Sequence, residues 1–187
     1  FLAPAMLFVL VGLVYPAIRT SILAFQTSSG DWTMDNFIWT FTQPAAIRTL
    51  INTIIWVLLV PTIATGIGLA YAVFIDRSRG EKYYKVVLFM PIAISFVGAG
   101  VIWRFVYEYR SGDREQIGLL NAIIVAFGGD PVQWMQTDPI NTLLLIIVMI
   151  WIQTGFAMVL LSAAIKGVPT EQIEAAQLDG TNGWQRF

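Results

Sequence analysis

Cysteine and histidine are both absent from the 187-residue sequence. Without cysteine, the chain can form no disulfide framework and carries no thiol nucleophile. The lack of both residue types argues against a transition-metal site and against a serine–histidine catalytic arrangement. No glycine-rich loop with the lysine that cradles nucleotide phosphates occurs either. We therefore expect a chain that is not an enzyme, binds no metal or cofactor and does not itself hydrolyse ATP.

Charged residues are also scarce, at 12% of the chain, whereas 57% of the residues are hydrophobic. The mean hydropathy is +0.69. This composition is typical of a membrane protein and not of a soluble core. The formal net charge of −1 does not suggest a nucleic-acid partner. The sequence lacks an initiator methionine and stops inside a polar segment, so we expect it to be a fragment of a longer polypeptide.

Four apolar stretches are long enough to cross the hydrocarbon core, which takes about 20 helical residues. They cover residues 1–18, 50–75, 86–106 and 142–165. A signal peptide is the alternative for the first stretch, but no charged segment precedes it and no small-residue cleavage site follows it. Pro91 predicts a kink in the third stretch. The sequence therefore predicts an all-α, polytopic membrane protein with four spans.

The orientation follows from the basic residues of the short segment 76–85, which are Arg77, Arg79, Lys82 and Lys85. Lys and Arg accumulate on the cytoplasmic side of membranes, so this loop and the N-terminus are predicted to be cytoplasmic. Residues 19–49 and 107–141 are then external connections. Acidic residues outnumber basic ones in the second of these, and residues 119–127 predict a helix too short to span. The segment after the fourth span returns to the cytoplasm.

Residues 166–187 follow the fourth span directly and are too polar to stay in lipid. Pro169 suits the first turn of a new helix, Glu171 suits its positive N-terminal end, and Gly180 suits its C-terminal end. Asn182 can cap a second short helix, from Trp184 to Phe187. The pattern predicts a helix of about ten residues, roughly 15 Å long, outside the membrane. An amphipathic helix resting at the lipid interface is the alternative.

A short string within this segment carries a family resemblance: Glu174, Ala175, Ala176, Asp179 and Gly180. It resembles the EAA motif of the membrane subunits of binding-protein-dependent ABC importers, which have the MetI-like fold. The wider match includes Trp151–Gln153 and Pro169 and is closest to the alpha-glucoside and maltose type of sugar importer. The resemblance covers essentially the whole chain.

The resemblance implies that residues 166–187 form the coupling loop. In that family this helix sits in a cleft of a cytoplasmic ATPase subunit, which the five motif residues would contact. The implied partners are a second permease subunit, two cytoplasmic ATPase subunits that carry ATP and magnesium, an extracytoplasmic sugar-binding protein and the lipid of a bacterial inner membrane. No nucleic acid is implied.

The resemblance also implies a substrate pathway, because sugar contacts in maltose-type permeases come from the middle of two spans. Carried over by position, they are Ile92, Ser95 or Phe96 in the third span, and Ile152, Gln153 and Phe156 in the fourth. Several residue types differ from the maltose type, so the identity of the sugar stays open. An amide offers sugar hydroxyls both a donor and an acceptor. The alternative for the glutamine is a hydrogen bond between helices.

Other transport classes remain as alternatives. A secondary transporter needs ionisable residues inside its spans, and the four apolar stretches contain almost none. A membrane-anchored receptor needs a folded soluble domain, for which no loop is long enough. An ABC importer permease for a polyol or glycerol phosphate is the closer competitor. Because the mid-span positions are neutral, we expect the pathway of a neutral oligosaccharide or alpha-glucoside.

Overall fold

The computed structural model describes residues 2–76, 78–112 and 114–186. The other residues lie outside the described residues: Phe1 of the predicted first span, Arg77 of the predicted cytoplasmic loop, Asp113 of a predicted external connection and Phe187 of the predicted coupling loop. The described part is helical, with one isolated antiparallel bridge and no strand. The chain divides into two compact units, residues 1–55 and 56–187.

The first unit begins with a continuous apolar helix of 21 residues. It consists of α1 (Ala3–Val9), the π-helical segment η1 (Leu10–Val14) and α2 (Tyr15–Leu23), so it extends beyond the predicted limit at residue 18. A turn leads to α3 (Asp35–Thr42), which the sequence analysis missed within its external connection. The Asn36 side chain donates to the carbonyls of Ala24 and Gln26 at 3.0 Å and holds α3 against the end of α2.

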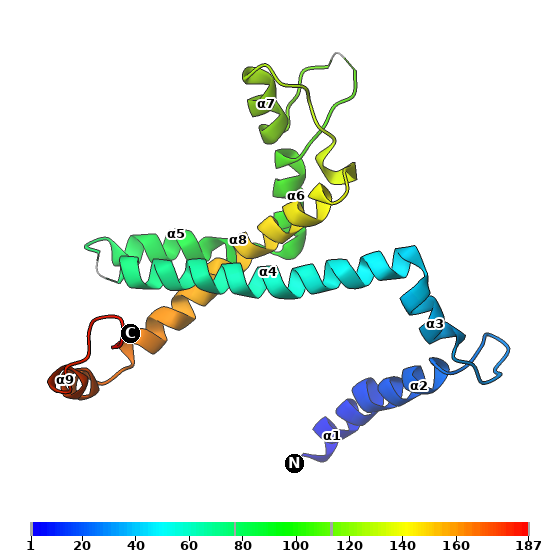
Figure 1. The fold of residues 1–187 in the computed structure, drawn as a ribbon, viewed down its shortest axis with the longest axis horizontal. Coiled ribbons are helices and arrows are strands. Elements are labelled where there is room, and N and C mark those ends of the chain that lie inside the picture. The colour runs from blue at the N-terminus through cyan, green and yellow to red at the C-terminus, as the bar shows by residue number, and fades with distance from the viewer. Residues whose placement is uncertain (1, 77, 113, 187) are drawn as a thin grey trace. The chain divides into compact units, whose positions relative to one another are not determined.

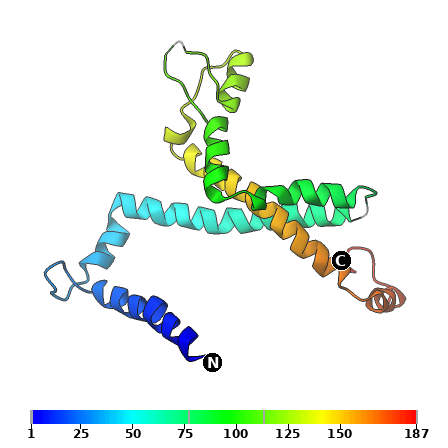
Figure 2. The same ribbon diagram turned by 180° about the vertical axis from the view of Figure 1, so that it is seen from behind.

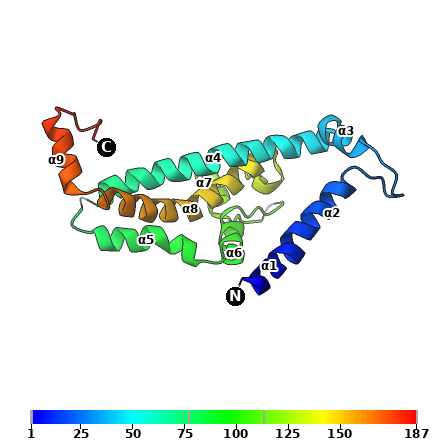
Figure 3. The ribbon, with the colours of Figure 1, turned by 90° about the horizontal axis from the view of Figure 1, so that it is seen from below.

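The helix α4 (Pro44–Ile75) has 32 residues and belongs to both units. It begins earlier than the predicted residue 50, because Pro44 suits the first helical position. In the second unit, residues 56–75 of α4 and α5 (Glu81–Ala93) both contact α8 (Ile140–Lys166), as Figures 1 and 3 show.

Two glycines allow these helices to approach closely. A Cβ added to Gly68 of α4 would lie 2.7 Å from Ala157 Cβ of α8. A Cβ added to Gly155 of α8 would lie 2.2 Å from the Leu88 carbonyl oxygen of α5. Small residues are typical of contacts between membrane helices. Next to these contacts Met158 is fully buried and forms a small core with Ala72 and Ile75.

The predicted third span, residues 86–106, consists of two helices bent by 98°. α5 begins at Glu81, inside the predicted cytoplasmic loop, and runs through Pro91 to Ala93. The break follows at Ile94 and Ser95, which have extended backbones, and the Ser95 hydroxyl caps α6 (Phe96–Val106) by accepting the Gly98 N–H at 3.1 Å. The bend therefore lies at this serine cap and not at Pro91; α6 turns away from α5 in Figure 1.

The connection after α6 contains the short helix predicted at residues 119–127. This helix is α7 (Leu119–Ala126), and the 3-10 turn η2 (Trp134–Gln136) follows it. After α8, the chain turns into α9 (Thr170–Leu178), which leaves the line of α8 in Figure 2. In the described chain, the helical runs long and apolar enough to cross a membrane are Ala3–Leu23, Pro44–Ile75 and Ile140–Lys166, and α5 with α6 qualifies as a fourth, broken span.

Candidate functional site

The predicted coupling helix is present as α9, directly after α8. Pro169 precedes its first residue, and Glu171 lies in its first turn, where negative charge is favoured. The helix has nine residues, and at 1.5 Å per residue its length is about 14 Å. Its extent and its start therefore agree with the prediction.

The C-terminal end of α9 is a Schellman motif. Gly180 has a φ of +78°, its N–H donates to the Gln177 carbonyl at 3.1 Å, and the Thr181 N–H donates to the Ala176 carbonyl at 3.2 Å. The Asn182 side chain then accepts the N–H groups of Trp184 and Gln185 at 3.0 and 2.9 Å. The glycine end of α9 and the asparagine cap are confirmed, but the described residues that follow Asn182, 183–186, form a turn and not the predicted second helix.

The motif residues of α9 face outward. Glu174, Ala175, Asp179 and Gly180 are exposed, and Ala176 is partly exposed. Leu178, an apolar residue on the same short helix, is 90% exposed. The helix is exposed and its C-terminal end is capped. Its surface combines an apolar side chain, two carboxylates and small residues, a combination suited to docking in a cleft. The assignment of that cleft to an ATPase stays a prediction.

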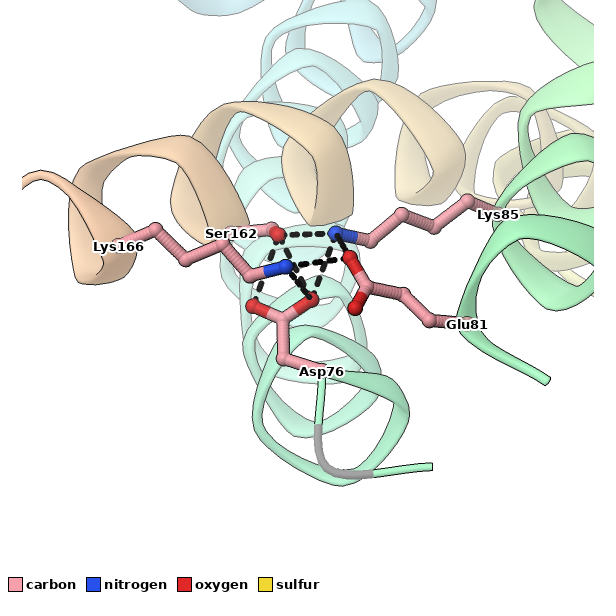
Figure 4. A network of polar contacts seen from close by, with 5 residues as sticks. All are labelled: Asp76, Glu81, Lys85, Ser162 and Lys166. Atoms are coloured by element: carbon pink, nitrogen blue, oxygen red, sulfur yellow. Dashed lines mark hydrogen bonds and ion pairs between the residues drawn. The ribbon is translucent and has the colours of Figure 1, made fainter. Parts of the chain in front are cut away.

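A network of charges lies where α4 ends, α5 begins and α8 ends (Figure 4). The Lys85 Nζ lies 2.6 Å from Asp76 Oδ1 and 2.9 Å from Glu81 Oε1. The Ser162 Oγ lies 2.8 Å from both oxygens of Asp76. Lys166, the last residue of α8, lies 3.6 Å from Asp76 Oδ1 and forms an ion pair with Glu81. The network therefore ties the end of α8, from which α9 departs, to both neighbouring helices.

The Asp76 carboxylate is the centre of this network, and only 11% of its side chain is exposed. Burial raises the pKa of the carboxyl. The hydrogen bonds from Lys85 and Ser162, with the charges of Lys85 and Lys166, outweigh that effect and leave the pKa of Asp76 below its usual range. The carboxylate is therefore ionised at neutral pH and holds both lysines.

The third-span residues of the predicted substrate pathway lie around the bend. Ile92 is partly buried near the end of α5. Ser95 is exposed, but its hydroxyl oxygen is engaged in capping α6. Phe96, the first residue of α6, is 69% exposed. The structure thus gives Ser95 a local structural role, and contact of these residues with a substrate stays a prediction.

The fourth-span residues lie on the part of α8 that contacts α5. Ile152 is 4% exposed, Gln153 is partly buried, and Phe156 is 50% exposed. Gly155, between the last two, contacts the backbone of α5 at Leu88. The structure therefore brings this segment of α8 alongside α5, with Ile152 packed inside the chain. Its contact with a substrate, and those of Gln153 and Phe156, stay predictions.

The sequence analysis missed the charge network, since it used the basic residues only to orient the chain. Part of the signal was available, because Glu81 and Lys85 have the i, i+4 spacing of a helical ion pair. It also missed Asn121, a fully buried side chain in the connection between α6 and α8. The amide donates to the Glu108 and Val132 carbonyls at 3.0 Å and accepts the Val132 N–H at 2.9 Å.

Comparisons with known proteins agree with this architecture. Residues 47–187 match the family described as "Binding-protein-dependent transport system inner membrane component". The alpha-glucoside transport system permease protein AglF of Rhizobium meliloti is 47% identical over an alignment of 189 positions, which covers 100% of this chain and 56% of that protein. The osmoprotective compounds uptake permease protein GgtC of Synechocystis sp. is 44% identical over 189 residues, 100% of this chain and 68% of that protein.

The fold also matches a solved structure. A crystal structure of a bacterial ABC transporter involved in the import of the acidic polysaccharide alginate superposes with a TM-score of 0.77 at 24% identity, over 97% of this chain and 62% of that one. Together with the apolar helices, the family match makes the chain a multi-pass membrane protein. The predicted all-α fold and the resemblance to importer permeases are thereby confirmed: the chain belongs to the family of inner membrane components of binding-protein-dependent transport systems.

Proposed function

We propose that this chain is part of the membrane-spanning subunit of an ATP-driven importer. It forms the translocation pathway for a neutral oligosaccharide or alpha-glucoside and couples to cytoplasmic ATPases through α9. The observation that carries the proposal is α9 itself, a capped helix that follows a membrane helix directly and exposes the motif residues Glu174 and Asp179. Family membership supports this role.

The proposed complex contains a second permease subunit, two ATPase subunits and an extracytoplasmic sugar-binding protein. ATP and magnesium are bound by the ATPases, and this chain carries out no catalysis. In the orientation given by the basic loop, the N-terminus and α9 lie in the cytoplasm. The Glu174 carboxylate pairs with a cation in the ATPase cleft, so closure of the two ATPases moves α9 as a rigid body.

The charge network transmits this motion to the spans. Lys166 ends α8, and α9 begins four residues later. Because Lys166 and Ser162 hold Asp76 at the end of α4, and Lys166 also holds Glu81 at the start of α5, a displacement of α9 moves all three helix ends together. The spans then rock as a group, and a site between them changes the side to which it opens.

The substrate in this proposal passes along α5, α6 and the middle of α8. Gln153 there offers the donor and the acceptor that a sugar hydroxyl requires, and Phe156 offers a ring for an apolar sugar face. None of the pathway residues is charged, which favours a neutral solute over an anion. The alpha-glucoside named for AglF, at 47% identity, supports this substrate class.

A second candidate function is import of a small osmoprotective solute such as a polyol. The observation that favours it is the 44% identity to GgtC, whose name specifies uptake of osmoprotective compounds. Both candidates use the same coupling helix and differ only in the pathway.

Uptake assays test the proposal and separate the two substrates. Cells without the complete transporter should lose uptake of a radiolabelled alpha-glucoside and regain it when the complete transporter is restored. Excess unlabelled glucoside should compete, and excess polyol should not. Competition by the polyol alone would favour the osmoprotectant function, whereas uptake that does not depend on the transporter at all would contradict both.

A further inference from the structure

A cavity of about 350 Å³ lies between α6, the segment around η2 and the first half of α8. Its volume falls in the range of small-molecule sites, roughly 300–1,000 Å³. None of the six predicted pathway residues lines it. Leu145 and Val148 form its α8 wall, and Val148 precedes Ser162 of the charge network by 14 residues, or about 21 Å of helix. The cavity therefore shares no residue with the charge network or with the six predicted pathway residues, and its Val148 lies about one helical turn before Ile152 of that pathway.

Hydrogen bonds fix the backbone walls of this cavity. Asn121 is fully buried and joins the Glu108 carbonyl to both backbone groups of Val132, which precedes the cavity residue Gln133. The Tyr107 hydroxyl donates to the Leu144 carbonyl of α8 at 3.2 Å. These bonds connect the end of α6, the segment before η2 and α8, so the cavity is a built feature and not a gap between loose segments.

Aromatic rings supply much of the cavity surface, from Trp103, Tyr107, Tyr109 and Trp134. Trp103 is held in place, because its ring packs against Tyr107 at 5.2 Å between centroids and edge-on against Trp151 at 5.6 Å. Both buried indole N–H groups, of Trp103 and Trp134, have no hydrogen-bond partner in the part of the chain that the structure describes. Buried indoles usually find an acceptor. Each of these rings lines the cavity and carries a donor that no described residue uses.

Polar side chains complete the lining, from Arg104, Glu108, Gln133 and Gln136. Guanidinium, carboxylate and amide groups together provide planar donors and acceptors for hydroxyls. The Arg104 Nε and the Glu108 Oε2 are 4.0 Å apart, so the two charges offset each other. A lining that is aromatic, rich in hydrogen-bonding groups and electrically balanced matches a neutral, polyhydroxylated ligand with apolar ring faces. Carbohydrates have this chemistry.

We propose that this cavity is a carbohydrate subsite at the outer end of the pathway, formed by residues other than the six predicted above. It binds one sugar unit of a neutral oligosaccharide as the oligosaccharide enters from the external side. The inference rests on the proposed function, because the external position follows from the orientation given above.

Transport kinetics of the complete transporter test the subsite with an alpha-linked glucose disaccharide and trisaccharide. Trp134→Leu removes a ring and should raise the KM for the trisaccharide by about threefold or more, in line with the strength of one aromatic contact. Trp134→Phe should restore most of the affinity. Trp32→Leu is the matched control, since Trp32 is an exposed tryptophan outside the cavity and should leave the KM unchanged.

The outcomes separate this inference from the proposed function. Wild-type import of the sugars with an unchanged KM in Trp134→Leu would overturn the subsite alone, whereas failure of the wild type to import either sugar would overturn the proposed function. A loss of affinity for the binding protein in the absence of sugar would assign the cavity to a side chain of that protein and overturn the subsite. Gln136→Ala, a change to an exposed rim residue, gives the same test if Trp134→Leu does not assemble.

Discussion

Gly155 is the position where a single methyl group should disturb the helix packing most. Its ideal Cβ would lie 2.2 Å from the Leu88 carbonyl oxygen and 3.0 Å from the Phe89 Cα. Both atoms belong to the backbone of α5, so no side-chain rotation can relieve the clash. An ordinary carbon-to-oxygen contact in helix interfaces is about 3.3 Å, so α5 and α8 would have to separate by about 1 Å.

The cost of that separation can be bounded. Inserting one extra carbon into a close-packed interior costs typically about 1–3 kcal/mol. Because the Gly155→Ala clash is between a side chain and a rigid backbone, we expect a value near the upper end, about 3 kcal/mol. The displacement would also shift Glu81 and Lys85 of α5 away from their partners in the charge network at the end of α4 and on α8.

Thermal unfolding of the complete transporter in nanodiscs measures this effect. We expect Gly155→Ala to lower the unfolding temperature and the uptake rate. Gly66→Ala is the matched control, because nothing lies within 4 Å of an added Cβ there. It should be neutral or stabilising by up to about 1 kcal/mol, since glycine weakens a helix interior. A Gly155→Ala transporter as stable and active as the wild type would show that α5 and α8 do not make this contact.

Three further predictions concern the end of α9, the charge network and the proposed substrate pathway. Gly180→Ala should destabilise the end of α9 by about 1–2 kcal/mol, because φ is +78° there, and speed hydrogen exchange in α9. Because the pKa of Asp76 is lowered, the stability that its carboxylate contributes should be complete above about pH 4 and should decline as the pH falls through the lowered pKa. Lys85→Met should weaken this pH dependence in acid titrations of unfolding. Gln153→Ala should raise the KM for sugar import while stability stays near that of the wild type.

The first two of these predictions have matched controls, and the third has a contradicting result. Gly112→Ala changes a glycine with a φ of +74° in the connection between α6 and α7, so it should leave exchange in α9 unchanged. Lys82→Met removes a nearby exposed lysine outside the network and should not alter the acid titration. If Gln153→Ala lowered the unfolding temperature without changing the KM, the glutamine would be a packing residue.

The sequence predicted α9 well because its signals are local. A proline before the helix, an acidic residue in its first turn and Gly180 at its end each act within a few residues, so the pattern alone defines the helix. The same holds for the short apolar helix α7. The bend between α5 and α6 was misplaced because Pro91 dominated the interpretation, although Ser95 followed by Gly98 is a plausible N-cap.

The charge network and the aromatic cavity could not be predicted, because their residues come from distant segments. Ser162 meets Asp76 across 86 positions, and this contact depends on how closely α4 and α8 approach. That approach depends in turn on the missing side chain at Gly68, whose packing partner on α8 no local pattern specifies. The cavity likewise depends on Asn121, whose three hydrogen bonds arrange the connection between α6 and α8.

The central claim is that α9 couples the spans to an ATPase. The most direct measurement is ATPase stimulation of the complete transporter in nanodiscs by sugar-loaded binding protein, compared for Glu174→Ala and Glu171→Ala. Both variants remove one exposed carboxylate from the same helix, but only Glu174 belongs to the motif.

Removing one partner of a buried ion pair costs roughly 3–5 kcal/mol. We therefore expect Glu174→Ala to reduce the stimulation of ATP hydrolysis by about tenfold or more, or to release the ATPase subunits from the complex. Glu171→Ala should keep near wild-type stimulation. Wild-type stimulation in an intact Glu174→Ala complex would contradict the coupling role of α9 and leave an interfacial helix as the better interpretation.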